Sequence, residues 1–173
     1  MVQYSLVHPE TRIKLIDTQW DRCLKALLDG QADLALTAGQ PSLSTFNSTL
    51  LFSDKFYLLC HRNHPLARLE MVDIADIGQY PFIGFCPGTR IRQHTDRLCD
   101  GREGFNYQME VRQLTTMMGL IAANYGVSIT TGLTLFQFRH KDIAIIPFRD
   151  LVLEAHKEII FLFMCSENGH HRV

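Results

Sequence analysis

The side chains of this sequence that could carry chemistry gather where two apolar runs stop. The first place is the corner His61-Arg62-Asn63-His64, which follows the apolar run 56–60 and precedes Pro65. The second is Cys86-Pro87-Gly88-Thr89-Arg90, which follows the run 82–85 and has the composition of a turn into a helix. Such a strand-to-helix turn leaves backbone N–H groups directed at whatever lies above the strand ends. We therefore expect polar groups to be presented at the ends of two strands.

The spacing of these residues gives little support to a metal site or an enzyme. His61 and His64 have an H-x-x-H spacing, but a metal site needs three or four ligands, and no further Cys or His lies at a recognisable spacing. The sequence has no G-x-S-x-G elbow, G-x-G-x-x-G loop or Walker loop. It therefore contains no motif that would indicate a hydrolase, a dehydrogenase or an NTPase. We expect no catalytic residue, metal or cofactor, while Cys86, ahead of a helix, could serve as a redox-sensing thiol.

Composition sets the broad class. With 173 residues, 46% hydrophobic and 20% charged, the chain can bury a core as one domain or as two small lobes. The net charge of -1 argues against an extended duplex DNA footprint. No apolar run reaches the roughly 18 residues needed to span a bilayer, and no signal pattern opens the chain, so we expect a cytoplasmic protein without a membrane partner. The five cysteines suit reduced thiols better than disulfides: Cys23, Cys60, Cys86, Cys99 and Cys165.

The first part of the chain predicts a parallel β-α-β unit. Thr11–Asp17 alternates polar and apolar residues, which is typical of a strand, and Asp33–Thr37 is the next strand. Between them lies a helix that ends near Gly30 and follows Thr18, a candidate N-cap. Its apolar residues recur at helical spacing and predict one buried stripe: Trp20, Cys23, Leu24, Leu27 and Leu28.

The remaining elements complete an α/β chain. Phe56–Cys60 is a continuous apolar run, as expected for an interior strand buried on both faces. Further strands are predicted at 82–85, 106–111, 127–129, 143–146 and 158–165, and further helices at 72–79, about 90–99, 113–125 and 133–138. Residues 2–7 read as the last turns of a helix, and 38–48 as a loop. The alternation favours a mostly parallel sheet, or two such sheets.

Several segments, taken in order, resemble the effector-binding domain of LysR-type transcriptional regulators. They are PETRIKLID, LLDGQADLAL, the run ending in HRNHPLA, YPFIGF and GLIAANYGVSI, and the resemblance extends from Pro9 to Phe163. The more specific parts are the strand containing Asp33, the sequence His64-Pro65-Leu66-Ala67 and the junction of a helix with Gly126. The resemblance implies two Rossmann-like lobes, as in type 2 periplasmic binding proteins, with a small-molecule site in the cleft between them.

The sequence departs from the family pattern in ways that limit this expectation. The family's N-terminal helix-turn-helix domain is missing, so DNA binding is expected only through a missing domain. The first strand of lobe I, most of its first helix and the closing C-terminal helix are also missing. We expect lobe I to comprise residues 1–72 and 146–173, and lobe II residues 73–145.

The resemblance also implies a set of effector contacts. In lobe I, Thr37 ends its strand where the family often places a hydroxyl against the ligand, although a Thr bonded to neighbouring backbone is an equal alternative. His61 occupies a strand end that contacts effector in some members, although a lone His there is more often a turn residue.

In lobe II, backbone N–H groups near the turn after 82–85 could hold a carboxylate, and an arginine fork would suit a planar anion, although a solvated Arg is the commoner outcome. The positions implied by the resemblance are Gly84, Phe85, Cys86, Pro87, Thr89, Arg90, Arg112 and Gln113. Two arginines and a histidine favour an anionic effector.

The function that this implies is ligand sensing in a transcription regulator. An effector would bind one arrangement of the lobes better than another, and full-length protein would work as a homodimer or homotetramer. Two alternatives stay open: a cytosolic small-molecule enzyme on the same fold, and a thiol-based redox switch using Cys86 or Cys99.

Overall fold

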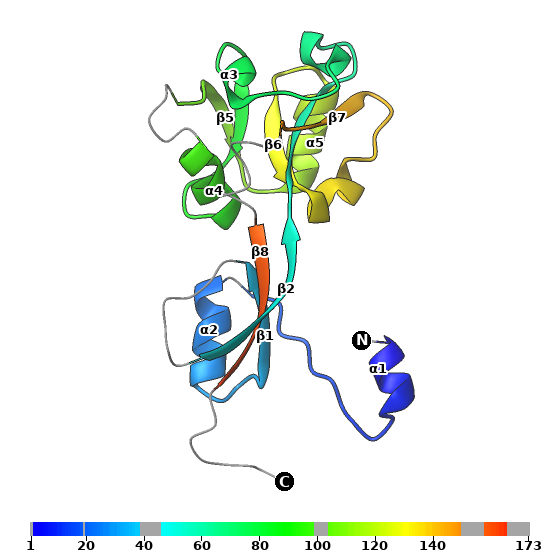
Figure 1. Ribbon diagram of the computed structural model, residues 1–173, viewed down its shortest axis with the longest axis vertical. Helices are drawn as coiled ribbons and strands as arrows, with labels where there is room; N and C mark the ends of the chain where they lie inside the picture. The colour runs from blue at the N-terminus through cyan, green and yellow to red at the C-terminus, as the bar shows by residue number, and fades with distance from the viewer. Residues whose placement is uncertain (1, 19, 39–45, 99–103, 150–157, 166–173) are drawn as a thin grey trace. The chain divides into compact units, whose positions relative to one another are not determined.

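The computed structural model describes residues 2–18, 20–38, 46–98, 104–149 and 158–165 (Figure 1). The chain divides into two compact units. Unit 1 comprises residues 1–50 and 161–173, and unit 2 comprises residues 51–160. Each unit has its own sheet and its own buried residues.

Unit 1 is built on a three-stranded sheet in the order β1-β8-β2. Its helices are α1 (Val2–Val7) and α2 (Trp20–Leu28), and its strands are β1 (Leu34–Ala38), β8 (Glu158–Cys165) and the first part of β2 (Phe46–Asp54). Helix α2 packs against β1, and Gly30 follows it with a positive φ of 67°, the left-handed conformation that ends many helices. The predicted helix and its glycine stop are confirmed.

The buried stripe of α2 is narrower than the sequence predicted. Leu24 and Leu27 are buried, Cys23 is half-buried, and Leu28 is 54% exposed, so including Leu28 in the stripe was wrong. On β1, Ala35 is buried whereas Leu34 and Leu36 are exposed. Within the described residues, α2 packs on this sheet with only nine residues, so it does not cover every apolar residue of the pattern. Trp20 lies outside the described side chains.

The prediction of a strand over Thr11–Asp17 was also wrong. The segment has no strand pairing within the described residues, and Ile13, Leu15 and Ile16 are exposed. Alternation of polar and apolar residues marks a segment that fits a sheet, but a strand forms only where a neighbouring strand accepts its hydrogen bonds. A parallel β-α-β unit around α2 is therefore not formed within the described chain.

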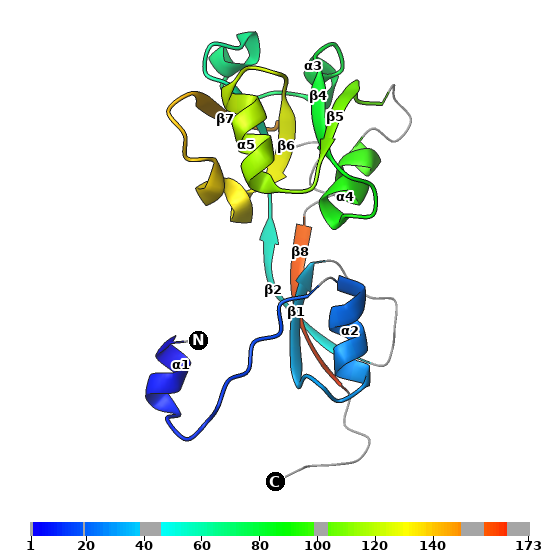
Figure 2. The ribbon, with the colours of Figure 1, turned by 180° about the vertical axis from the view of Figure 1, so that it is seen from behind.

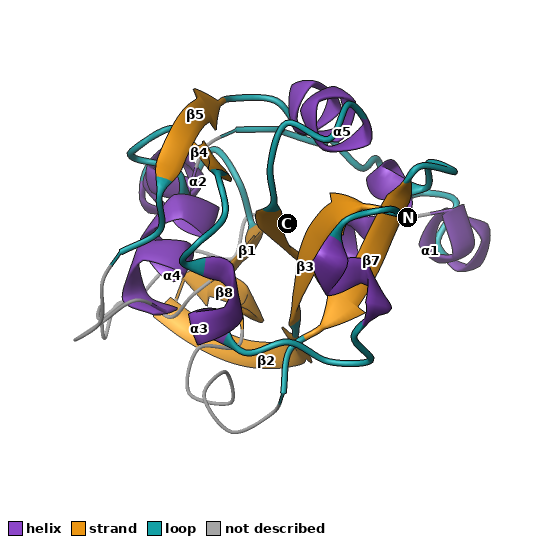
Figure 3. Cartoon of the chain, turned by 90° about the horizontal axis from the view of Figure 1, so that it is seen from above, coloured by secondary structure: helices purple, strands orange, loops and turns teal. Residues whose placement is uncertain are grey.

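Unit 2 is organised around β3 (Phe56–His61), as the apolar run predicted. Leu58, Leu59 and Cys60 are completely buried. Strand β3 lies between β6 (Ser128–Thr131) and β7 (Ile143–Pro147), and it is antiparallel to both. The view from above shows β3 and β7 side by side (Figure 3). The expectation of a mostly parallel sheet missed these antiparallel pairs.

Two further strands of unit 2 are parallel to each other. Strand β4 (Phe82–Phe85) pairs with β5 (Tyr107–Val111), and the two lie side by side in Figure 2. A parallel bridge between Phe82 and Val127 connects β4 to the start of β6. Strands β4, β5, β6 and β7 therefore run in one direction, and β3 runs in the opposite direction.

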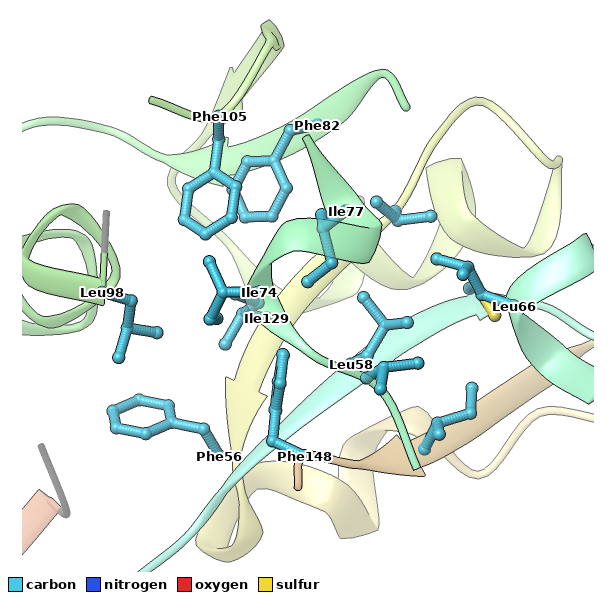
Figure 4. Close-up of a cluster of buried hydrophobic side chains, with 14 residues drawn as sticks. Phe56, Leu58, Leu66, Ile74, Ile77, Phe82, Leu98, Phe105, Ile129 and Phe148 are labelled. Carbon is cyan, nitrogen blue, oxygen red and sulfur yellow. The ribbon is translucent and has the colours of Figure 1, made fainter. Parts of the chain in front are cut away.

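Helices cover both faces of the unit 2 strands. The α-helices are α3 (Ile74–Ile77), α4 (Arg90–Leu98) and α5 (Leu114–Ala122), and the 3-10 helices are η1 (Pro65–Arg68) and η2 (Gly132–Phe138). Met117 and Ile121 of α5 pack with Leu59 of β3 in one buried cluster. A second cluster includes Phe56 and Leu58, and Figure 4 shows the rings of Phe82 and Phe105 facing each other, with centroids 4.3 Å apart. Because alternate side chains of β3 enter different clusters, this strand holds both faces together.

Strand β2 was not expected, because residues 38–48 read as a loop and Phe46–Asp54 contains Asn47, Ser48 and Thr49. The units also divide at positions 50/51 and 160/161, whereas the expected lobes divide at 72/73 and 145/146. The difference arises because β3 pairs with β6 and β7. The assignment of regulatory lobes to these units stays a prediction.

Candidate functional site

The direction of the strands defines two edges in unit 2. Phe85, Val111 and Thr131 end β4, β5 and β6, and they mark what we call the carboxyl edge. Phe56 of the antiparallel strand β3 pairs with Thr131, so β3 begins at this edge and ends at the opposite one, the amino edge. Ligands of open α/β sheets bind outside the carboxyl ends of the strands. The carboxyl edge is thus the place to look for a site.

The turn after β4 is joined to the end of β5. The N–H of Cys86 donates to the carbonyl oxygen of Val111 at 2.9 Å. This bond brings 86–89 beside Arg112 and Gln113, which directly follow β5. The eight site residues predicted in lobe II therefore lie on two chain segments that this bond joins: Gly84, Phe85, Cys86, Pro87, Thr89, Arg90, Arg112 and Gln113.

The backbone N–H groups of this turn are not as free as the sequence suggested. The N–H of Cys86 is bonded to Val111, and Pro87 has none. The hydroxyl of Thr89 accepts a hydrogen bond from the N–H of Arg92 at 3.3 Å and donates to the carbonyl oxygen of Cys86 at 3.0 Å. Thr89 is thus the N-cap of α4. The prediction that this turn leaves its own N–H groups free was wrong at these positions, because helix capping and strand pairing use them.

Gly84 and Phe85 have packing roles. A Cβ atom on Gly84 would overlap the ring of Tyr107, which lies against this strand, and Phe85 is buried with Val111 and Met117. Their side-chain positions face the core and leave no polar group for a ligand. Cys86 is half-buried, Pro87 is exposed, and the side chain of Arg90 lies outside the described part of the structure.

Arg112 and Gln113 are the exposed polar residues of the carboxyl edge. Gln113 is the N-cap of α5, and its side chain makes no capping hydrogen bond. The guanidinium of Arg112 makes no hydrogen bond or ion pair with another described residue. Arg112 therefore presents a positive charge beside the start of a helix, where the helix dipole also favours an anion.

His61 lies at the amino edge, away from these residues. It ends β3 opposite Ile143, and its Nδ1 atom accepts a hydrogen bond from the N–H of Asn63 at 3.1 Å. The imidazole thus closes the turn before His64, which was the alternative weighed against an effector contact. Thr37 is buried in β1 of unit 1. Effector contacts at His61 and Thr37 stay predictions.

Two polar residues of the carboxyl edge were missed by sequence reasoning. Asp54 is buried, and its carboxylate accepts hydrogen bonds from the N–H groups of Lys55 and Leu133, each at 2.8 Å. Thr131 is buried at the N-cap of η2. The sequence Thr130-Thr131-Gly132 after an apolar strand is a cap signal that could have identified Thr131. Asp54 could not be found without recognising β2.

A charged cluster fixes α4 on the ends of β4 and β5. Arg92 bonds Glu110 at 2.6 Å and Asp96 at 2.8 Å, and its guanidinium lies 3.9 Å from the centroid of the Tyr107 ring. The hydroxyl of Tyr107 donates to Asp96 at 2.7 Å. Burial, followed by this hydrogen bond, raises the pKa of Tyr107, so its phenol stays protonated at neutral pH.

The described residues show no other chemical centre. They contain no group of three or more His, Cys, Asp or Glu side chains that could hold a metal ion. Cys23, Cys60 and Cys86 are free thiols, and burial raises the pKa of Cys60 to about 11. Cys99 lies outside the described residues, and so does the side chain of Cys165. No helix in the described ranges combines the length and apolar character needed to cross a membrane.

Comparison with known proteins gives a consistent result. The family model described as LysR substrate binding domain matches residues 1–162. The chain is 25% identical over 159 residues to the uncharacterized HTH-type transcriptional regulator YbhD of Escherichia coli, covering 91% of this chain and 50% of that protein. It is 28% identical over 125 residues to the transcriptional dual regulator GltC of Bacillus subtilis, covering 70% and 41%. The chain thus spans about half the length, or less, of these relatives.

Solved structures share the fold. The BenM effector binding domain with its effector benzoate superposes with a TM-score of 0.85 at 20% identity, covering 96% of this chain and 76% of that one. The effector binding domain of QuiR in complex with shikimate gives a TM-score of 0.78 at 19% identity, covering 97% and 79%. Effector-binding domains of this kind have the fold of type 2 periplasmic binding proteins, which confirms the predicted fold class.

Proposed function

Because the chain belongs to the family of LysR substrate binding domains, we propose that it is the ligand-sensing part of a LysR-type transcription regulator. It binds a small anionic effector and transmits binding to an attached DNA-binding domain. It acts in the cytoplasm, in a homodimeric or homotetrameric full-length protein, and it catalyses no reaction. Effector binding shifts the protein from one arrangement of the lobes to another only to the extent that the effector has a higher affinity for one of them.

The hydrogen bond between the N–H of Cys86 and the carbonyl oxygen of Val111 carries this proposal, because it brings the turn after β4 beside Arg112. The exposed guanidinium at the start of α5 supplies two parallel N–H donors, which match the two oxygens of a carboxylate. Benzoate and shikimate, the ligands of the BenM and QuiR domains, are both carboxylates. A carboxylate effector at Arg112 follows from these observations taken together.

We propose that the effector contacts residues that lie at the carboxyl edge. Arg112 binds the carboxylate, and Gln113 and Cys86 lie beside it. Thr89 shapes the turn through its capping bonds. Thr131 lies at the same edge, at the end of β6. His61 and Thr37 lie outside this edge, and contacts from them to an effector stay predictions.

The test measures binding of benzoate, shikimate and the uncharged analogue benzamide to the chain by calorimetry and thermal shift. We expect at least one carboxylate to bind and Arg112→Ala to weaken it by about tenfold or more, since a charge-assisted hydrogen bond is worth about 1.5 to 3 kcal/mol. Arg97→Ala, at an exposed arginine in the last turn of α4, is the matched control.

Three results would count against the proposal. If benzamide bound with the same affinity as benzoate, the negative charge of the effector would have no role in binding. Equal affinity in Arg112→Ala and in the wild-type chain would remove the role of Arg112. A loss of carboxylate binding in His61→Asn would show that the site includes the amino edge of the sheet.

A further inference from the structure

The amino edge of unit 2 carries a group of polar side chains that effector binding at the carboxyl edge does not use. Strand pairing places His61 opposite Ile143, and the N–H of Arg62 donates to the carbonyl oxygen of Asp142 at 2.8 Å. The turn after β3 and the segment before β7 are therefore held side by side. We call the resulting surface the turn patch; it comprises His61, Arg62, His64, Arg139, His140 and Lys141.

The three histidines of the turn patch are held in one tautomer. The Nδ1 atoms of His61, His64 and His140 accept hydrogen bonds from the backbone N–H groups of Asn63, Leu66 and Asp142 at 3.1, 3.2 and 3.3 Å. An imidazole whose Nδ1 atom accepts a hydrogen bond has its N–H donor on Nε2. Each ring therefore has an N–H donor on the atom that the turn does not use.

The fixed charges of the patch are also donors. Arg139 and Lys141 are exposed and make no ion pair with another described residue. The guanidinium of Arg62 lies 3.9 Å from the carboxylate of Asp142, which is shared with His140 at 3.9 Å. The patch thus carries three fixed cations, and among them only Arg62 lies near the carboxylate of Asp142, so it keeps an excess of positive charge although the whole chain has a net charge of -1.

We propose that the turn patch is a docking surface for an acidic segment of a partner protein, one that carries several Asp or Glu side chains in succession. Three fixed cations and three imidazole N–H groups offer donors and almost no acceptors, which is the complement of a row of carboxylates. The patch lies at the edge of the sheet opposite Arg112, so effector and partner occupy different surfaces of unit 2.

Nucleic acid fits this surface less well. Duplex DNA is bound through many phosphate contacts along an extended row of cations, and the patch has three fixed cations within two short turns. A short acidic peptide needs only a few charge-assisted contacts, and such contacts at an exposed rim govern the rate of association and its salt dependence. The proposal therefore commits to a protein partner.

The test uses a fluorescein-labelled oligo-glutamate peptide and fluorescence anisotropy, with the chain titrated at low and at high NaCl. We expect the dissociation constant to rise by about tenfold in the double variant Arg139→Gln/Lys141→Gln, since it removes two of the three fixed cations that would contact the carboxylates. The control Arg12→Gln/Lys14→Gln changes the net charge equally at exposed residues outside the patch, and we expect it to bind like the wild-type chain.

A second variant tests the imidazole donors. Asparagine at positions 61 and 140 can accept the same turn N–H groups through its side-chain oxygen while removing the Nε2 donors. We therefore expect His61→Asn/His140→Asn to keep its stability in urea and to weaken peptide binding. Equal loss of binding in the patch variant and in the Arg12/Lys14 control would overturn the proposal, and so would tighter binding of a short DNA duplex through the same residues.

Discussion

The guanidinium Nη1 atom of Arg92 donates to the carbonyl oxygen of Phe85 at 3.0 Å, across seven residues of the chain. This bond joins the first turn of α4 to the last residue of β4. The turn 86–89 is thereby closed at both ends, at Phe85 by Arg92 and at Cys86 by Val111. The shape of the carboxyl edge thus depends on a residue that is not itself placed to contact an effector.

Arg92→Leu tests this arrangement. The side chain of Arg92 is 15% exposed. Its removal leaves the carbonyl oxygen of Phe85 without this donor, and it leaves the carboxylates of Glu110 and Asp96 without the cation that both of them bind. We expect the free energy of unfolding to fall by about 2 kcal/mol, as for other hydrogen bonds with charged groups. Urea denaturation measures the change. Arg97→Leu, on the same helix but exposed, serves as the control and should stay within about 0.5 kcal/mol of wild type.

Gly84→Ala is expected to disturb the same region by overpacking. The added methyl group would overlap the ring of Tyr107, whose hydroxyl is held by Asp96 at 2.7 Å, so the ring cannot move without losing that bond. We expect a loss of about 1 to 3 kcal/mol in the free energy of unfolding. The double variant Gly84→Ala/Tyr107→Ser removes the overlap. If the double variant loses as much free energy of unfolding as the two single variants together, the Tyr107 ring is not the reason for a glycine at position 84.

Asp54→Ala should destabilise unit 2. The buried carboxylate caps η2 through the N–H of Leu133 and also accepts from Lys55, so alanine leaves two N–H groups without these partners. A cost of about 2 kcal/mol is expected. Asp54→Asn keeps one acceptor and should lose less. Asp29→Ala breaks an exposed ion pair with Lys25 and provides the comparison, with a change of less than about 1 kcal/mol.

Stability should also depend on pH through His64. Burial lowers the pKa of His64 below its ordinary value of 6.5, and the charge of the neighbouring His61 lowers it further. The unfolded chain then binds a proton more readily than the folded chain. The contribution of neutral His64 is therefore present above about pH 6.5, and it decreases as the pH falls from there toward the lowered pKa.

Urea denaturation of wild type and His64→Asn at about pH 7.5 and about pH 5.5 checks this expectation. Asparagine can accept the N–H of Leu66 as His64 does, but it does not titrate. The decrease in free energy of unfolding between the two pH values should be smaller in the variant. An equal decrease in both proteins would assign the pH dependence to other groups.

Local sequence was enough to locate most elements. The apolar run of β3, the helical spacing of Leu24 and Leu27 before Gly30, and the helix that ends before Gly126 each follow from residues close together in the chain. Side-chain periodicity and backbone conformation at glycine are local properties, so these elements could be predicted. The fold family could be recognised for the same reason, because its segments occur in order along the chain.

Pairing between distant segments decided the rest. Thr11–Asp17 has the pattern of a strand but no partner within the described residues, whereas β2 has a weaker pattern and is paired. The antiparallel direction of β3 places His61 at the amino edge, far along the strand from Thr131, and it brings the turn patch together. The hydrogen bond of Cys86 to Val111 joins Arg112 to the turn. The sequence by itself thus determined most of the helices and strands, but only the tertiary structure decided which segments pair and which edge each polar residue occupies. Strand direction and register depend on hydrogen bonds between residues far apart in the chain.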